Sequence, residues 1–156
     1  MSQVLIIGYG NPLRGDDGVG WHAAQRLARS LADRDVAIQT THQLTPEMAE
    51  AVSRAARVIF LDAACDQRPG EIALRTVQPD PAPSEMFSHQ LTPELLLALS
   101  KRLYGSCPEA VLLTVGAASF ECGETLSPAV ASALPALLEQ VHTASRMGLQ
   151  PCPAIL

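Results

Sequence analysis

The regular alternation of apolar runs with amphipathic stretches is the feature that most constrains how this chain can fold. Apolar or alternating runs of strand length occupy residues 4–8, 35–40, 57–62, 70–77 and 110–116. Apolar residues recur at helical spacing within residues 19–31, 46–56, 92–104 and 127–147. Strands that alternate with helices predict an α/β fold with right-handed crossovers. We therefore expect a doubly wound domain with a mostly parallel sheet and helices on both faces, residues 70–77 forming an edge strand.

The length of the chain limits it to one such domain. Its 156 residues, 47% of them hydrophobic, supply one core of ordinary size and no second domain. We place the α/β domain at residues 1–147 and expect residues 148–156, with two prolines, to form a loosely held tail. Residues 78–89 contain three prolines and are expected to form a long surface loop.

Charge and composition exclude several classes of partner. The chain has 11 Lys and Arg residues against 16 Asp and Glu residues, so the electrostatic drive for nucleic-acid binding is missing. The first residues lack the basic start of a signal peptide, and no segment approaches the roughly 18 apolar residues of a membrane span. We therefore expect a cytoplasmic protein with no nucleic-acid or membrane partner. The four cysteines include no Cys-x-x-Cys pair and are expected to be reduced.

The motifs of several common enzyme classes are missing from the sequence. Gly8-x-Gly10 follows the first strand, but Leu13 occupies the third glycine position of a dinucleotide fingerprint and Pro12 interrupts the turn. The chain also lacks the P-loop, the Gly-x-Ser-x-Gly elbow and the His-Glu-x-x-His motif. Chemistry must therefore come from residues scattered over several loops.

Reactive side chains are expected where strands end, because parallel α/β sheets bind ligands outside the carboxyl ends of their strands. Asp16 and Asp17 follow the first strand where the first long helix begins, and capping of that helix explains only one of them. Asp62 ends the third strand-like run. His89 lies just before a helix that we expect to begin with Thr92 as its N-cap.

These positions provide two carboxylates and one imidazole from three loops. Such a set binds a first-row divalent metal and leaves coordination positions open for water or substrate. Because the oxygens are hard ligands and only one nitrogen is present, we expect modest affinity, with the metal arriving with the substrate. Cys65 offers an alternative, a cysteine nucleophile paired with His89, although a small apolar filler is the simpler interpretation. His22 and the other two histidines are interpreted as ordinary surface or partly buried residues.

Three segments stand out when they are taken in series. They are Gly-Tyr-Gly-Asn-Pro-Leu-Arg-Gly-Asp-Asp-Gly-Val-Gly (8–20), Phe-Leu-Asp-Ala (60–63) and Ser-His-Gln-Leu-Thr-Pro (88–93). In order and spacing they resemble the hydrogenase maturation protease family, the C-terminal endopeptidases of nickel-iron hydrogenases. The resemblance extends over residues 4–141, with Val-Gly-Ala at 115–117 and Leu-Ser-Pro at 126–128.

The resemblance implies an enzyme that removes a short C-terminal extension from a nickel-containing hydrogenase large-subunit precursor after nickel insertion. The nickel then serves as the recognition signal and is supplied by the substrate rather than held permanently. Carried over by position, the family's metal contacts fall on Asp17, Asp62 and His89. Some members have Glu at the first of these positions, so Asp17 reaches one methylene less far, and Asp16 is the alternative for that role.

Two routes to hydrolysis remain open at this point. In the one we favour, nickel positions the peptide and Asp17 or Asp62 is the general base for water; in the other, nickel polarises the scissile carbonyl. Two different functions also remain. They are a non-catalytic, nickel-dependent chaperone of the precursor and a cysteine hydrolase that uses Cys65 and His89.

Overall fold

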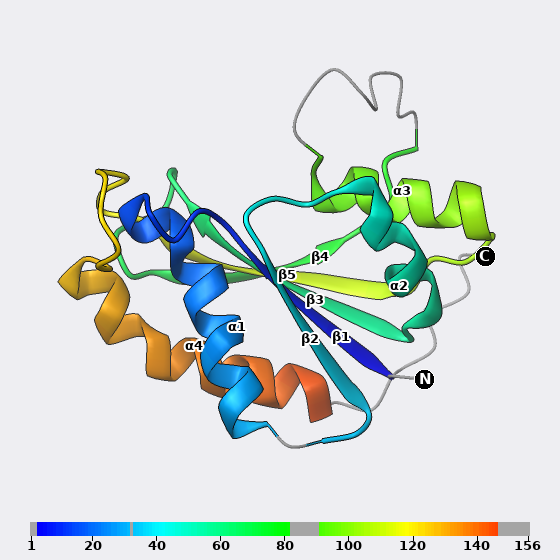
Figure 1. Ribbon diagram of the computed structural model, residues 1–156, viewed down its shortest axis with the longest axis horizontal. Coiled ribbons are helices and arrows are strands. Elements are labelled where there is room, and N and C mark those ends of the chain that lie inside the picture. The colour runs from blue at the N-terminus through cyan, green and yellow to red at the C-terminus, as the bar shows by residue number, and fades with distance from the viewer. Residues whose placement is uncertain (1–2, 32, 82–90, 147–156) are drawn as a thin grey trace.

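The computed structural model describes residues 3–31, 33–81 and 91–146 and contains one sheet with helices on both sides (Figure 1). The strands are β1 (Val4–Tyr9), β2 (Val36–Thr41), β3 (Arg57–Ala64), β4 (Ile72–Val77) and β5 (Glu109–Gly116). The α-helices are α1 (Val19–Ser30), α2 (Ala49–Arg54), α3 (Pro93–Tyr104) and α4 (Pro128–Arg146). Two short 3-10 helices, η1 (Gly15–Gly18) and η2 (Pro46–Met48), precede α1 and α2.

The sheet has the strand order β2-β1-β3-β5-β4. β1, β2, β3 and β5 are parallel to their neighbours, whereas β4 pairs antiparallel with β5 at the edge. The predicted α/β class, mostly parallel sheet and edge strand are therefore confirmed. In the register, Gly8 lies opposite Leu61 and Asp62 lies opposite Thr114. The carboxyl ends of β1, β3 and β5 thus meet at one edge of the sheet.

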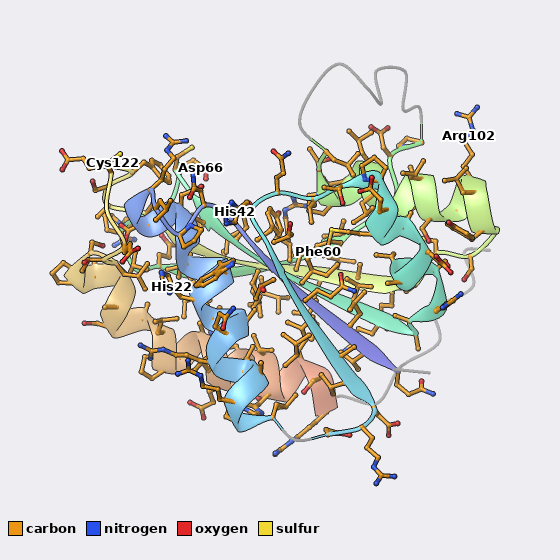
Figure 2. The ribbon with its side chains drawn as sticks, in the orientation of Figure 1. His22, His42, Phe60, Asp66, Arg102 and Cys122 are labelled. Atoms are coloured by element: carbon orange, nitrogen blue, oxygen red, sulfur yellow. The ribbon has the colours of Figure 1, made fainter. Side chains whose placement is uncertain are left out.

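Each face of the sheet is covered by one pair of helices. α1 and α4 cover one face, and α2 and α3 cover the other (Figure 1). Side chains alternate along each strand, so Ile59 and Leu61 pack with α1 and α4 while Phe60 packs with α2 and α3 near the middle of the sheet (Figure 2). Because both faces are buried, the central strands are apolar at nearly every position.

Several element boundaries follow local sequence signals. α3 begins as predicted, since the Thr92 hydroxyl oxygen accepts a hydrogen bond of 3.2 Å from the Leu95 N–H. It ends at Gly105, whose φ of 71° is left-handed. The helix predicted over residues 46–56 is shorter than expected. The N–H groups of Ala56 and Arg57 donate to the carbonyl of Gln3, so the chain is already entering β3 there.

Three expectations fall wholly or partly outside the described residues. These are the tail at 148–156, most of the predicted loop at 78–89, and His89 itself. Within the described residues, no helix combines the length and the apolar character that crossing a membrane requires.

Candidate active site

The loop after β1 brings Asp17 back to the carboxyl end of the sheet. Gly10 has a φ of 138°, and a Cβ there would lie 1.9 Å from the Asp17 carbonyl oxygen, so only glycine allows the loop to close this tightly. The Asn11 N–H donates a hydrogen bond of 2.9 Å to Asp17 Oδ2. Asp17 is half-buried, and its carboxylate is held by the turn that carries it.

Asp62 lies next to this loop, on the sheet face covered by α2 and α3. Its Oδ1 accepts a hydrogen bond of 2.7 Å from the Ala63 N–H, and the Tyr9 hydroxyl donates a second hydrogen bond to the carboxylate. Asp62 was expected at the end of its strand, but β3 continues to Ala64. The strand is longer because β5 pairs with it as far as Gly116.

Burial dominates the electrostatics of Asp62. It raises the pKa of the Asp62 carboxyl to about 7, and the charge of Asp17 acts in the same direction. The hydrogen bonds from Ala63 and Tyr9 lower the pKa and only partly offset burial. A carboxyl with such a pKa is divided between its two protonation states near neutral pH. It can accept a proton from water, or lose its own proton to solvent when a metal binds.

Tyr9 is the hydrogen-bond donor in this pair over the whole physiological pH range. The side chain is 8% exposed, and burial, followed by the charge of Asp62, raises the pKa of its hydroxyl far above the ordinary value. The hydroxyl therefore stays protonated beside Asp62.

Asp16 and Asp17 differ completely in their surroundings. Asp16 is 1% exposed, and its carboxylate accepts hydrogen bonds from Ala118 N–H (2.8 Å), Ser119 N–H (3.1 Å), Ser127 N–H (2.7 Å) and Ser127 Oγ (2.8 Å). Burial alone would raise the pKa of Asp16, but these hydrogen bonds hold it below the ordinary value. Asp16 thus fastens η1 to the loop between β5 and α4.

The proposed N-cap role is wrong for both residues. They lie in η1, the N-cap position of α1 is Gly18, and no side chain caps that helix. Asp16 lies in η1, before α1 begins, and from there its carboxylate reaches the β5–α4 loop. Asp16 is thereby committed to structure, which leaves Asp17 as the carboxylate open to a ligand.

The structure therefore brings Asp17 and Asp62 together, while His89 lies outside the described residues. The helix that follows His89 in sequence starts near the pair, since the charge of Glu94 in its first turn acts on the Tyr9 hydroxyl. Among the residues described, no group of three or more His, Cys, Asp or Glu side chains could hold a metal ion. Asp17 and Asp62 supply two oxygen donors, so a metal here needs further donors from elsewhere.

Cys65 lies just beyond β3 and is exposed, so its interpretation as a small apolar filler is wrong. An exposed thiol one residue past the sheet faces solvent and fills no core position. Cys122 is an exposed free cysteine as well, as expected for a reduced protein, and Cys152 lies outside the described residues.

Replacing Tyr9 with phenylalanine should raise the pKa of Asp62 further, because the variant loses a hydrogen bond that stabilises the carboxylate. We expect the basic form at pH 7 to decrease, and any activity that needs it to fall about 3- to 10-fold. Carboxyl-carbon NMR titration of Asp62 measures the change directly. Tyr104→Phe, at an exposed tyrosine on α3, is the matched control. A pKa of Asp62 that is unchanged or lower in Tyr9→Phe would contradict the assignment.

Comparison with solved structures identifies proteins that share this fold. A hydrogenase 2 maturation peptidase from a Thaumarchaeota archaeon superposes with a TM-score of 0.71 at 26% identity, covering 96% of this chain and 100% of that one. A solution structure of an Escherichia coli endopeptidase gives a TM-score of 0.74 at 25% identity, with 96% of both chains covered. The chain has the fold of the hydrogenase maturation proteases. The resemblance predicted from sequence is thereby confirmed.

Other hydrogenase maturation proteases agree with this result. The hydrogenase maturating endopeptidase HybD from Escherichia coli has a TM-score of 0.72 at 24% identity and covers 94% of this chain and 93% of its own length. No protein-family model matches the chain, and no curated protein matches it. The neighbours are named as peptidases or endopeptidases, in agreement with the enzyme class predicted from the sequence.

Proposed function

We propose that this chain is an endopeptidase that removes the C-terminal extension of a nickel-iron hydrogenase large-subunit precursor after nickel has been inserted. One observation carries the proposal. Asp17 and Asp62, separated by more than 40 residues in sequence, interact at the carboxyl edge of a sheet that has the hydrogenase maturation protease fold. Two such carboxylates provide both metal-contacting oxygens and a general base.

The donor set suits a metal that arrives with the substrate. We assign Asp17, Asp62 and His89 as the contacts to nickel held by the precursor. Asp62 loses its proton when the cation binds, since its pKa of about 7 means that deprotonation costs little free energy at neutral pH. Two oxygens and one nitrogen bind a divalent cation only moderately, so a complete site forms when the precursor adds its own ligands. Recognition of the metal thus tests whether the precursor is loaded.

Where Asp17 and His89 contact the nickel, Asp62 is instead suited to activate water. A general base is most effective when its pKa lies near the working pH, and Asp62 meets that condition better than an ordinary aspartate. Hydrogen bonds from the Tyr9 hydroxyl and the Ala63 N–H orient the carboxylate. The carboxylate takes a proton from water as the oxygen attacks the scissile carbonyl. Asp17 is the alternative base in the same site.

The test incubates the purified protein with nickel-loaded and nickel-free precursor and follows the large-subunit mass, with His89→Ala in parallel. We expect a loss of mass only in the nickel-loaded sample, and at least about 100-fold less cleavage with His89→Ala. Equal cleavage of both samples would refute the nickel-dependent step. Nickel-dependent complex formation without any loss of mass would replace the proposal by the chaperone function.

Cys65→Ser separates the carboxylate mechanism from the cysteine alternative. The side chain is exposed and serine preserves its size, so full cleavage activity is expected. Loss of turnover with precursor binding intact would favour the cysteine nucleophile instead.

A further inference from the structure

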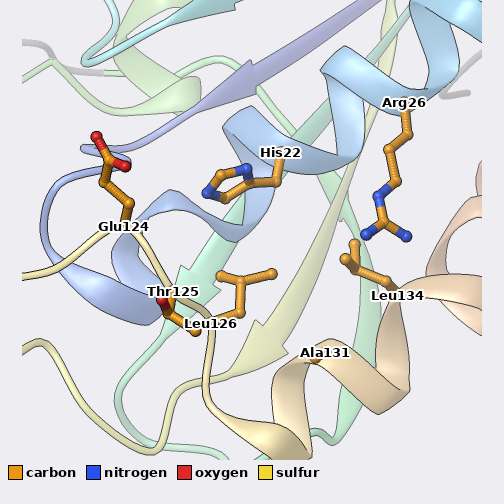
Figure 3. A pocket seen from close by; sticks show the side chains of 7 residues that line it. All are labelled: His22, Arg26, Glu124, Thr125, Leu126, Ala131 and Leu134. Carbon is orange, nitrogen blue, oxygen red and sulfur yellow. The ribbon is translucent and has the colours of Figure 1, made fainter.

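A hollow of about 320 Å³ lies on the other side of the sheet from Asp62, between α1, the β5–α4 loop and the start of α4 (Figure 3). Its apolar floor is formed by Leu126, Ala131 and Leu134. Polar side chains border it, with His22 and Arg26 on α1 and Glu124 on the loop. None of these residues belongs to the candidate active site.

The pocket shares an edge of the sheet with Asp17. α1 follows β1 and α4 follows β5, so both helices begin at the carboxyl edge, and the pocket lies between their first turns. The loop that borders it is the one that Asp16 holds through Ser127, the residue next to Leu126. The pocket therefore lies toward the same edge of the sheet as the candidate active site.

Hydrogen bonds and ion pairs between the polar side chains of the pocket and other described residues are few. His22 Nε2 is buried and has no hydrogen-bond partner among the described residues. Arg26 and Glu124 are exposed, and no ion pair joins either of them to another described residue. Figure 3 shows Glu124 and Arg26 on opposite sides of His22. The pocket thus presents a positive group, a negative group and an imidazole above an apolar floor.

Charge complementarity selects the kind of molecule that fits. A simple anion such as phosphate would be opposed by Glu124, and a simple cation by Arg26. A peptide segment satisfies both, because its carbonyl groups accept from the guanidinium and its N–H groups donate to the carboxylate. An apolar side chain on the same segment covers Leu126 and Leu134, and the volume suits one such residue.

We propose that this pocket is an exosite that binds a peptide segment of the protein substrate through one apolar side chain and its flanking backbone. The identity of that substrate rests on the proposed function. The exosite adds contacts away from the scissile bond, which raise affinity and help to select the precursor among other nickel proteins.

The test fills the pocket and measures precursor binding and cleavage separately. Ala131→Trp places an indole over the floor, and Ala136→Trp, at another exposed alanine of α4, is the matched control. We expect about 10-fold weaker binding of nickel-loaded precursor for Ala131→Trp and wild-type affinity for Ala136→Trp. Arg26→Glu, compared with Arg29→Glu on the exposed side of α1, tests the same pocket without added bulk.

The outcomes distinguish the exosite from the proposed activity. Normal cleavage and affinity in both Ala131→Trp and Arg26→Glu would overturn the exosite and leave the endopeptidase standing. Precursor binding that Ala131→Trp weakens, without cleavage by the wild type, would support the exosite and refute the endopeptidase. Absence of any precursor binding by the wild type would overturn both.

A synthetic peptide of the C-terminal extension that competes in the wild type but not in Ala131→Trp would assign the bound segment to the extension; lack of competition would assign it to the body of the precursor.

Discussion

Replacing Asp16 with alanine is expected to lower the free energy of unfolding by about 3 to 5 kcal/mol, a large share of the stability of a domain this size. The reason is the number of groups that depend on this one carboxylate. It is 1% exposed and accepts hydrogen bonds from the N–H groups of Ala118, Ser119 and Ser127, besides the Ser127 hydroxyl. Without it, three N–H groups at the two ends of the β5–α4 connection lose their partner.

Replacing Asp17 with alanine should lower the stability only slightly and reduce cleavage strongly. Asp17 is half-buried and accepts one hydrogen bond of 2.9 Å from the Asn11 N–H, so we expect less than about 1 kcal/mol loss of stability. Its proposed contact with the nickel of the precursor predicts a loss of cleavage of at least about 100-fold. The adjacent aspartates thus separate into one that maintains the fold and one that serves the site.

Urea denaturation monitored by circular dichroism measures both free energies of unfolding, and a cleavage assay on the folded variants measures the activities. Asp16→Asn is a useful intermediate, since its oxygen still accepts hydrogen bonds while its NH₂ group faces donors. It should lie between the wild type and Asp16→Ala in stability. A loss of less than about 1 kcal/mol in Asp16→Ala would show that the four hydrogen bonds of Asp16 contribute little.

The difference between these two neighbours shows where sequence reasoning stops. Periodicity and the Asp16–Asp17 pair located the edge of the sheet. They also indicated that one of the two carboxylates was not needed to cap the first long helix. The family resemblance favoured Asp17, but the residue pattern itself could not tell which one, because the partners of Asp16 lie 102 to 111 residues further along the chain. Only the packing of the β5–α4 loop against η1 decides the question.

Tyr9 was missed for a related reason, although a signal was present. Tyr9 lies on the same face of β1 as Leu5 and Ile7, and the register that places Gly8 opposite Leu61 sets Tyr9 beside Asp62. The strand order β1-β3 was needed to use that pattern. The fold itself was predictable, since it depends on local periodicity, whereas the polar partner of Asp62 depends on which strands become neighbours.

Asp62→Asn is expected to abolish most of the cleavage activity and at the same time to stabilise the protein above neutral pH. Asparagine cannot accept a proton from water, so we expect cleavage to fall at least about 100-fold if Asp62 is the base or contacts the nickel. Stability should change in the other direction. The wild-type carboxyl is charged in a buried place that asparagine occupies as a neutral group.

The sign of the pH dependence follows from the pKa of about 7 in the folded protein against the ordinary value of 3.8. The folded state binds this proton more tightly than the unfolded state, so the wild type carries no penalty below pH 4. It loses stability as the pH rises from about 4 to 7, and the penalty is complete above that range. The upper limit is about 4 kcal/mol, and partial exposure of the side chain reduces our expectation to roughly 2 kcal/mol.

Free energies of unfolding at pH 4 and pH 8 for the wild type and Asp62→Asn test this directly. The advantage of the variant should be roughly 2 kcal/mol larger at pH 8 than at pH 4. Asp66→Asn, at an exposed aspartate in the loop after β3, controls for a general change of charge. A difference between Asp62→Asn and wild type that stays constant over this range would mean that Asp62 titrates near its ordinary pKa. Its burial would then have no role in making it a base at neutral pH, and Asp17 would become the better candidate.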